Sequence, residues 1–157
     1  MDGDNREAKK AAADKAEIVR RLKTVRPDCT RRWGRMSAHQ MVCHLSDAFR
    51  LVTHQKAASP ATGIVQVTLI KWIALYVPFR WPQGVPTRPE MDQEFEGTKP
   101  RDFAADLAEL ESLVERIATV GKDYDWPAHP IFGRMSESAW MRWAYLHVDH
   151  HLRQFGL

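Results

Sequence analysis

Residues 140–154 read WMRWAYLHVDHHLRQ and hold three of the seven histidines in this 157-residue chain. An α-helix turns about 100° per residue, so His147 and His151 project from one face, one turn apart, where two imidazoles can share a metal ion. The same face carries Trp140, Trp143, Ala144 and Gln154, and the opposite face carries Arg142, Asp149 and Arg153. This pattern predicts that the histidines face inward and that the charged face meets water, with Asp149 and Arg153 spaced for an ion pair.

Two buried histidines need a further group to close a metal site. An internal repeat indicates where that group lies, because Gly133-Arg134-Met135-Ser136 before this helix repeats Gly34-Arg35-Met36-Ser37 before an earlier one. If each serine is an N-cap, His44 follows seven residues on and His147 eleven, and their directions around the helix differ by about 40°. His44 is therefore predicted to join His147 and His151. The alternative for each is a hydrogen-bonded core histidine.

Periodic apolar positions predict the remaining helices. One covers residues 4–25, with a frayed start over residues 1–8. A second begins at Ser37, which forms a capping box with Gln40, and reaches about Gln55, and another runs from Phe103 to Gly121. No segment alternates with the period of a strand. The prediction is an all-α chain, a single domain over residues 1–157, built as a four-helix bundle with an additional helix and a long proline-rich loop.

The additional helix covers about residues 63–77 and is strongly apolar. It is shorter than the roughly 17–20 residues that a membrane span needs, and it contains Gln66 and Lys71, so it is predicted to be a buried helix with no membrane partner. Five of the nine prolines then fall between Pro78 and Pro100, which predicts a long loop. A loop of this kind is either a lid or binding loop over a site, or a structural crossover.

The charge composition argues against a nucleic-acid partner. The 23 basic and 20 acidic residues are well mixed and give a net charge of only +3. Cys29 and Cys43, with no signal peptide ahead of them, indicate a reducing compartment, and the cytoplasm is the expected location. The sequence leaves the oligomeric state open, and a homodimer is compatible with it.

Several segments resemble the DinB superfamily of four-helix bundles, also described as YfiT-like metal-dependent hydrolases. They are residues 33–37 (WGRMS), 41–45 (MVCHL), 129–136 (HPIFGRMS) and the pair His147-x-x-x-His151. The resemblance covers nearly the whole chain and is to an uncharacterised branch of that superfamily. Members place one histidine on the second helix and a His-x-x-x-His pair on the last, often ending His-Arg-Gly-Gln. This chain has Leu152-Arg153-Gln154 after His151.

The resemblance implies a divalent ion, zinc or nickel, held by His44, His147 and His151. Characterised relatives include thiol-dependent transferases and a mycothiol-dependent isomerase, and others are stress-induced proteins. Two classes of function follow. In the first, the chain is an enzyme whose metal activates a low-molecular-weight thiol for transfer to a small molecule, or water for hydrolysis of one. In the second, it is a non-catalytic protein that binds metal or a small ligand in a stress response. The sequence assigns no catalytic side chain and no other cofactor.

Further polar residues lie near these histidines in sequence. Asp47, one turn beyond His44, suits a carboxylate that orients an imidazole or acts as a base, and equally a surface carboxylate. His150 lies at the edge of the inward face and is a weaker candidate, as a reserve ligand or an orienting group. His129, before Pro130, is predicted to be a structural hydrogen-bond partner or a reserve fourth ligand. His39 projects from the wet side of its helix and is not counted as a ligand. Cys43 points about 100° away from His44 and is predicted to be a small buried hydrophobe.

Overall fold

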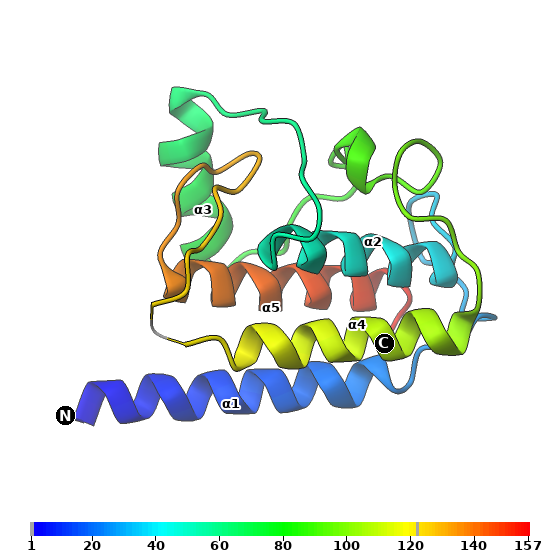
Figure 1. Cartoon of the computed structure of the whole chain (residues 1–157), viewed down its shortest axis with the longest axis horizontal. Coiled ribbons are helices and arrows are strands. Elements are labelled where there is room, and N and C mark those ends of the chain that lie inside the picture. The colour runs from blue at the N-terminus through cyan, green and yellow to red at the C-terminus, as the bar shows by residue number, and fades with distance from the viewer. Residues whose placement is uncertain (1, 122) are drawn as a thin grey trace.

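Four long helices form the body of the molecule in the computed structural model, which describes residues 2–121 and 123–157, without the side chains of residues 2–8, 10 and 11 (Figure 1). They are α1 (Asp2–Leu22), α2 (Ala38–Val52), α4 (Phe103–Ala118) and α5 (Glu137–Gln154). Across the described residues there is no strand, only one antiparallel bridge between His129 and Gly133. The predicted all-α class is confirmed. The prediction that residues 1–8 are frayed concerns Met1 and the side chains of residues 2–8, which lie outside the described part of the structure.

The repeated Gly-Arg-Met-Ser motif marks the starts of α2 and α5. Ser37 Oγ accepts a hydrogen bond from the Gln40 backbone N–H at 3.1 Å, and Gln40 Oε1 accepts one from the Ser37 N–H at 2.8 Å, which is the predicted capping box. Ser136 caps α5 through the N–H of Ala139. Gly34 has a φ of 79°, in the left-handed region that glycine adopts at least cost. The two motifs therefore place His44 and His147 at comparable positions after an N-cap.

The hydrophobic core lies along α2, which is buried over most of its length and packs on α4. α2 ends at Val52 and α4 at Ala118, slightly before the predicted Gln55 and Gly121. Burial of each large apolar side chain contributes about 1.5–3 kcal/mol, so this layer is the main source of stability. Across the whole core, the most deeply buried large apolar side chains, all at 0–1% exposure, are Leu22, Met41, Val42, Leu45, Val52, Leu75, Leu110, Trp140, Val148 and Leu152.

The charged face of α5 packs against α1. Asp149 forms the predicted ion pair with Arg153 at 2.6 Å, and it also accepts a hydrogen bond from Arg21 of α1 at 2.8 Å. The side chains of Arg21 and Asp149 are only 10% and 15% exposed. The prediction that this face meets water was wrong, because α1 covers it and supplies a cation for the carboxylate.

The apolar run forms a continuous helix over residues 64–76, which we call the outer helix. It consists of one short turn, the π-helical segment η1 (Gln66–Ile70) and α3 (Lys71–Tyr76). Figure 1 shows it rising away from the four long helices, with α3 beside α5. The predicted helix is present, but the prediction that it is buried was wrong. Leu75 is buried, at 1% exposure, whereas Ile64, Leu69, Trp72 and Tyr76 are 84%, 56%, 58% and 50% exposed.

Helix length and apolarity also bear on the membrane prediction. Over residues 2–121 and 123–157, none of the helices has the length and apolar character that crossing a bilayer requires.

Asp47 anchors the proline-rich loop to α2. The loop contains one short 3-10 helix, η2 (Pro89–Met91), and then passes over Asp47, which is 0% exposed. The carboxylate accepts hydrogen bonds from Lys56 Nζ at 2.7 Å, from Arg50 at 2.9 Å and from the backbone N–H and hydroxyl of Thr98 at 2.8 and 2.6 Å. Burial would raise the pKa of Asp47, but the hydrogen bonds from Lys56 and Thr98 outweigh it and hold that pKa below its usual value. The surface-carboxylate interpretation of Asp47 was wrong.

Replacing Asp47 should destabilise the whole fold. Asp47→Ala leaves Lys56 and Arg50 facing a space without an anion and frees the loop at Thr98, so we expect the free energy of unfolding to fall by about 3–5 kcal/mol. Urea unfolding followed by far-UV circular dichroism measures it. The matched control is Asp28→Ala, which breaks a pair with Arg26 whose side chains are 74% and 72% exposed, and it should change little. Similar losses in the two variants would contradict the anchoring role.

Candidate metal centre

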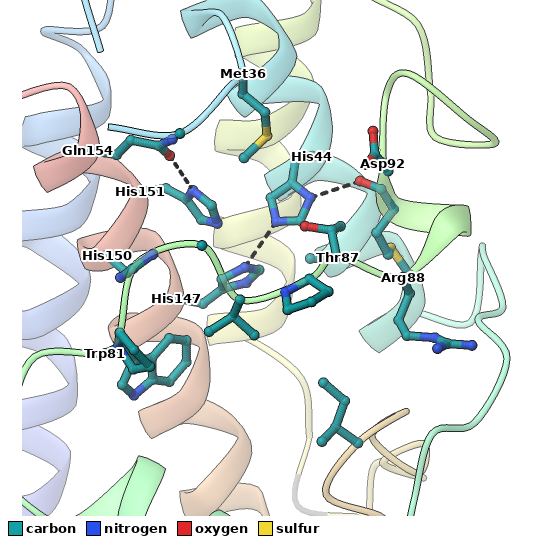
Figure 2. A pocket seen from close by; sticks show the side chains of 18 of the residues that line it. Met36, His44, Trp81, Thr87, Arg88, Asp92, His147, His150, His151 and Gln154 are labelled. Carbon is teal, nitrogen blue, oxygen red and sulfur yellow. Dashed lines mark hydrogen bonds between the residues drawn. The ribbon is translucent and has the colours of Figure 1, made fainter. Parts of the chain in front are cut away.

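Three histidines converge where α2 faces α5 (Figure 2). His44 Nε2 lies 3.1 Å from His147 Nε2, and the ring centroid of His151 lies 4.7 Å from that of His44 and 4.9 Å from that of His147. One nitrogen from each ring falls within 4.8 Å of the others. His44 and His151 are buried, at 5% and 8% exposure, and His147 is partly buried. The prediction that these three side chains meet is confirmed, and we call them the histidine triad.

Hydrogen bonds fix the protonation of two rings. His44 Nδ1 lies 2.9 Å from the backbone oxygen of Met91, which can only accept, so Nδ1 carries the proton and Nε2 keeps its lone pair. Gln154 donates from Nε2 to the backbone oxygen of Trp33 at 2.9 Å, which turns its Oε1 toward His151 Nδ1, also at 2.9 Å. His151 therefore donates from Nδ1 and likewise keeps a lone pair on Nε2.

His147 is held by packing. Its ring lies against Trp143, with 4.7 Å between ring centroids, and beside Trp81 at 6.2 Å. Its Nδ1 is buried and has no hydrogen-bond partner among the described residues. The lone pair of His44 Nε2 points at His147 Nε2, so a proton or a cation must lie between them to prevent repulsion. The unpartnered atom Nδ1 is on the far side of the ring from Nε2, so it bears on how His147 is held and not on what the triad binds.

The environment keeps all three rings neutral. Burial lowers the pKa of His44 below its usual value, against the opposing effect of its bond to Met91. Burial also lowers the pKa of His147 and of His151 well below the usual value, and the neighbouring histidines add to the effect. Neutral imidazole is the form that binds metal, so the triad is ready to coordinate at neutral pH.

The donor set fits a divalent ion. Two nitrogens bound to one zinc at about 2.0–2.1 Å in tetrahedral geometry lie about 3.3 Å apart. The separation between His44 Nε2 and His147 Nε2 is 3.1 Å, so this pair needs little movement, and the nitrogen of His151 lies within 4.8 Å of both. Imidazole ligands suit zinc, copper, iron and nickel alike, so the donors do not choose among these metals.

His150 and His129 line the same pocket outside the triad. The ring of His150 meets Trp33 and Trp81, each at 6.0 Å between centroids. His129 Nδ1 accepts hydrogen bonds from the backbone N–H groups of Ile131 and Phe132, both at 3.1 Å. This bonding matches the predicted structural role, and burial lowers the pKa of His129 to about 3.

Asp47 does not contact the triad through a hydrogen bond in the described structure. The oxygen that orients His44 belongs to Met91. Met91 lies in the loop segment that also holds Gln93 and Thr98, both of which donate to Asp47. Asp47 therefore acts on His44 of the triad through the loop.

A second cluster joins α2 to α4. His39 Nε2 lies 2.7 Å from Asp106 Oδ2, and Cys43 donates weakly to the same oxygen at 3.7 Å. The prediction that His39 projects to water was wrong, because its side chain is only 20% exposed and packs on Phe103. The three ligand atoms are close enough to hold an ion. Burial, with Asp106 adding to it, raises the pKa of Cys43 to about 12, which keeps the predicted buried thiol protonated.

The triad opens into a pocket of about 700 Å³. The proline-rich loop forms one wall of it, so this loop does more than connect α3 to α4. The outer helix and the 129–132 segment form the other walls, and α2 and α5 carry the triad at its base. Its apolar lining includes Ile70, Ile73, Ala74, Phe79, Trp81, Val85, Pro86, Ile131, Phe132 and Trp143.

Sequence reasoning did not assign the groups that orient the triad. Gln154 stands three residues after His151 on the same helix face, and this spacing could have identified it. The backbone oxygen of Met91 carries no signal in the sequence, because any residue at that position offers the same atom.

Fold and site together define an all-α protein with a buried histidine triad at the base of an apolar pocket. The chain belongs to the family described as Protein of unknown function (DUF1569), whose model matches residues 6–156. No curated protein and no solved structure matches the chain.

The buried histidines should make stability depend on pH. His129 has a pKa of about 3 in the folded chain, against about 6.5 when unfolded, so its contribution is complete above pH 6.5 and is lost as the pH falls toward 3. His129→Asn keeps an acceptor for the two backbone N–H groups but does not titrate. We expect the free energy of unfolding of this variant to fall less steeply between pH 6.5 and 4, by up to about 1.4 kcal/mol per pH unit. Parallel slopes, measured by urea unfolding in the presence of a chelator, would exclude this role.

Proposed function

We propose that this chain is a metal-dependent enzyme of the DinB-like superfamily, in which His44, His147 and His151 hold a divalent ion, zinc or nickel. The observation that carries the proposal is the convergence of three neutral imidazoles, two of which have their free lone pair fixed toward the centre by Met91 and Gln154. In the proposed reaction, the sulfur of an activated thiol is transferred to a small molecule, or activated water hydrolyses a small molecule. Such an ion, when bound, supplies Lewis-acid chemistry that lowers the pKa of a thiol or of water.

The resemblance in sequence supports the superfamily assignment. His44 on the second long helix and His147 and His151 on the last stand where the DinB pattern has its histidines. In the common ending His-Arg-Gly-Gln, the glutamine follows the histidine by three residues, as Gln154 follows His151 here. The contact between Gln154 and His151 gives that spacing a physical role, because it sets the tautomer of a ligand.

The surrounding side chains supply positioning and proton transfer. Trp81 and the proline-rich loop shield the triad from bulk water. His150 lines the pocket beside His151, with 5.2 Å between ring centroids. Burial lowers the pKa of His150, so its ring is neutral at pH 7 and can accept a proton from a substrate thiol or from water.

The second candidate is a non-catalytic stress-response protein that binds metal or a small ligand. The deep burial of His44 and His151 favours it, since closed sites are typical of structural metals. The open pocket above the triad favours the enzyme, because a substrate can reach the centre from there.

Metal content and turnover should be lost together when a triad residue is removed. We expect the untagged wild-type chain, reconstituted with zinc or nickel, to bind one ion per chain, and His151→Ala to lose it while its far-UV circular dichroism stays helical. Mass-spectrometric metal analysis and turnover assays with a panel of thiols and electrophiles measure the two properties. His54→Ala, an exposed histidine outside the triad, is the control and should keep its metal. A wild-type chain that stays empty would end the metal proposal, and stoichiometric metal without turnover would favour the binding protein.

Gln154 should tune metal affinity through His151. Gln154→Leu removes the oxygen that accepts from His151 Nδ1, and we expect metal to bind about 10–100-fold more weakly. Gln154→Glu keeps an acceptor at that place and should retain most of the affinity, although it loses the bond to Trp33. Competition with a chromophoric chelator measures both constants. Equal losses in the two variants would point to a packing role for Gln154 in place of an orienting one.

A further inference from the structure

The pocket above the triad is apolar over most of its lining. Its volume of about 700 Å³ lies in the range of roughly 300–1,000 Å³ that holds drug-sized ligands. One wall comes from the outer helix, through Ile70, Ile73 and Ala74, and another from the loop, through Phe79, Trp81 and Val85. The polar histidines gather at its base. Apolar walls and a polar base give the cavity two chemically different ends.

Most groups of the charged side chains that line this cavity are paired within the protein, although Arg88 Nε is buried and has no hydrogen-bond partner among the described residues. Arg35 contacts Glu94 at 2.9 Å and Asp92 at 3.3 Å, and Arg88 donates to the Ser59 hydroxyl. A sugar or a nucleotide would bring many hydroxyl or phosphate oxygens against walls that offer few groups to bond them. Each polar group buried without a partner costs free energy, so such ligands are selected against.

Apolar surface continues from the cavity to the outside of the molecule. Ile70, Phe79 and Val85 line the cavity and are nevertheless 42%, 45% and 58% exposed. A contiguous exposed apolar surface that joins a cavity is typical of a ligand-binding groove. A ligand with an apolar body would cover these side chains, so its burial would add to the affinity.

We propose that the site acts on an amphiphile whose polar head meets the triad and whose alkyl or aryl body lies between the outer helix and the proline-rich loop. The position of the head rests on the proposed function. The proposal of an apolar body is argued from the cavity walls alone, so each of the two parts can be tested and rejected separately.

Two homologous series test the apolar body. Calorimetry measures the binding of n-alkanethiols and of n-alkanols, from three to eight carbons, to the full chain with and without zinc. We expect Kd to fall about three- to fourfold per added methylene in both series, because each methylene leaves water for an apolar wall. With zinc, the thiols should bind more tightly than alcohols of the same length. A Kd that does not change with chain length in either series would overturn the proposal.

Neighbouring residues of η1 provide a matched pair of variants. Ile70 lines the cavity, whereas Leu69, which is 56% exposed, is not among its lining residues. Ile70→Asp should weaken octanol binding at least tenfold, and Leu69→Asp should leave it within twofold. Ala74→Phe, which adds bulk inside the cavity without adding charge, should abolish the gain from the longest chains. Equal effects of the two aspartate variants, or an unchanged series in Ala74→Phe, would place the ligand elsewhere and overturn the proposal.

The alcohol series also distinguishes a failure of this inference from a failure of the proposed function. His151→Ala removes the metal site but leaves the cavity walls, so the alcohols should keep their dependence on chain length in this variant. If wild-type protein binds no metal and the alcohols keep that dependence, the metal proposal fails alone. If metal binds and chain length has no effect, the amphiphile proposal fails alone.

Discussion

The structure depends on a constraint at its centre, where three imidazoles are buried with nitrogen atoms facing one point. Burial removes the water that would otherwise solvate those nitrogens, and it lowers the pKa of each ring, so at neutral pH the rings stay neutral and take up no additional proton. The 3.1 Å contact between His44 and His147 can persist only with a proton or a cation between the nitrogens. The orienting bonds from Met91 and Gln154 keep two of the lone pairs aimed at that point, so the site is organised before anything binds.

Asp47 fixes the loop that orients His44. A carboxylate with no exposure is stable only when it is well paired, and here its partners come from both α2 and the distant loop. Those bonds fix residues 93–98, and the same loop carries the Met91 oxygen that orients His44 and the side chains that line the pocket. One buried charge thus couples the position of His44 to the shape of the cavity. Asp47 is important to the site because it is bonded to this loop, although it makes no hydrogen bond to the triad in the described structure.

The sequence predicted those features of the fold that are local along the chain. Helix periodicity and the repeated Gly-Arg-Met-Ser motif placed the starts of α2 and α5 and the directions of His44 and His147 around their helices, because side-chain direction follows directly from the helical repeat. Features that depend on which helices become neighbours could not be obtained in this way. His39 was assigned to water because nothing near it in sequence reveals Asp106 on α4, and Asp149 was assigned to water because nothing local reveals Arg21 on α1. Asp47 was left between two interpretations for the same reason, since its loop partners lie some 50 residues away.

The outer helix is the clearest case in which local composition gave a wrong prediction, since the helix was expected to be buried. An apolar run with few charges is typical of a core helix, yet here one side lines a cavity and the other faces outward. A cavity with apolar walls tends to collapse unless its walls are held apart, because the walls gain contacts by closing. Two bonds fix the outer helix to the segments around it: Lys71 Nζ donates to the Arg134 oxygen, and Arg142 donates to the Leu75 oxygen. Trp81 Nε1 donates to the Ala74 oxygen and so joins the two walls at one edge of the cavity. Prolines in the facing loop add stiffness, because a fixed φ leaves less freedom for it to close. These bonds fix the outer helix at its distance from the loop, so that one of its sides lines the cavity and the other remains exposed.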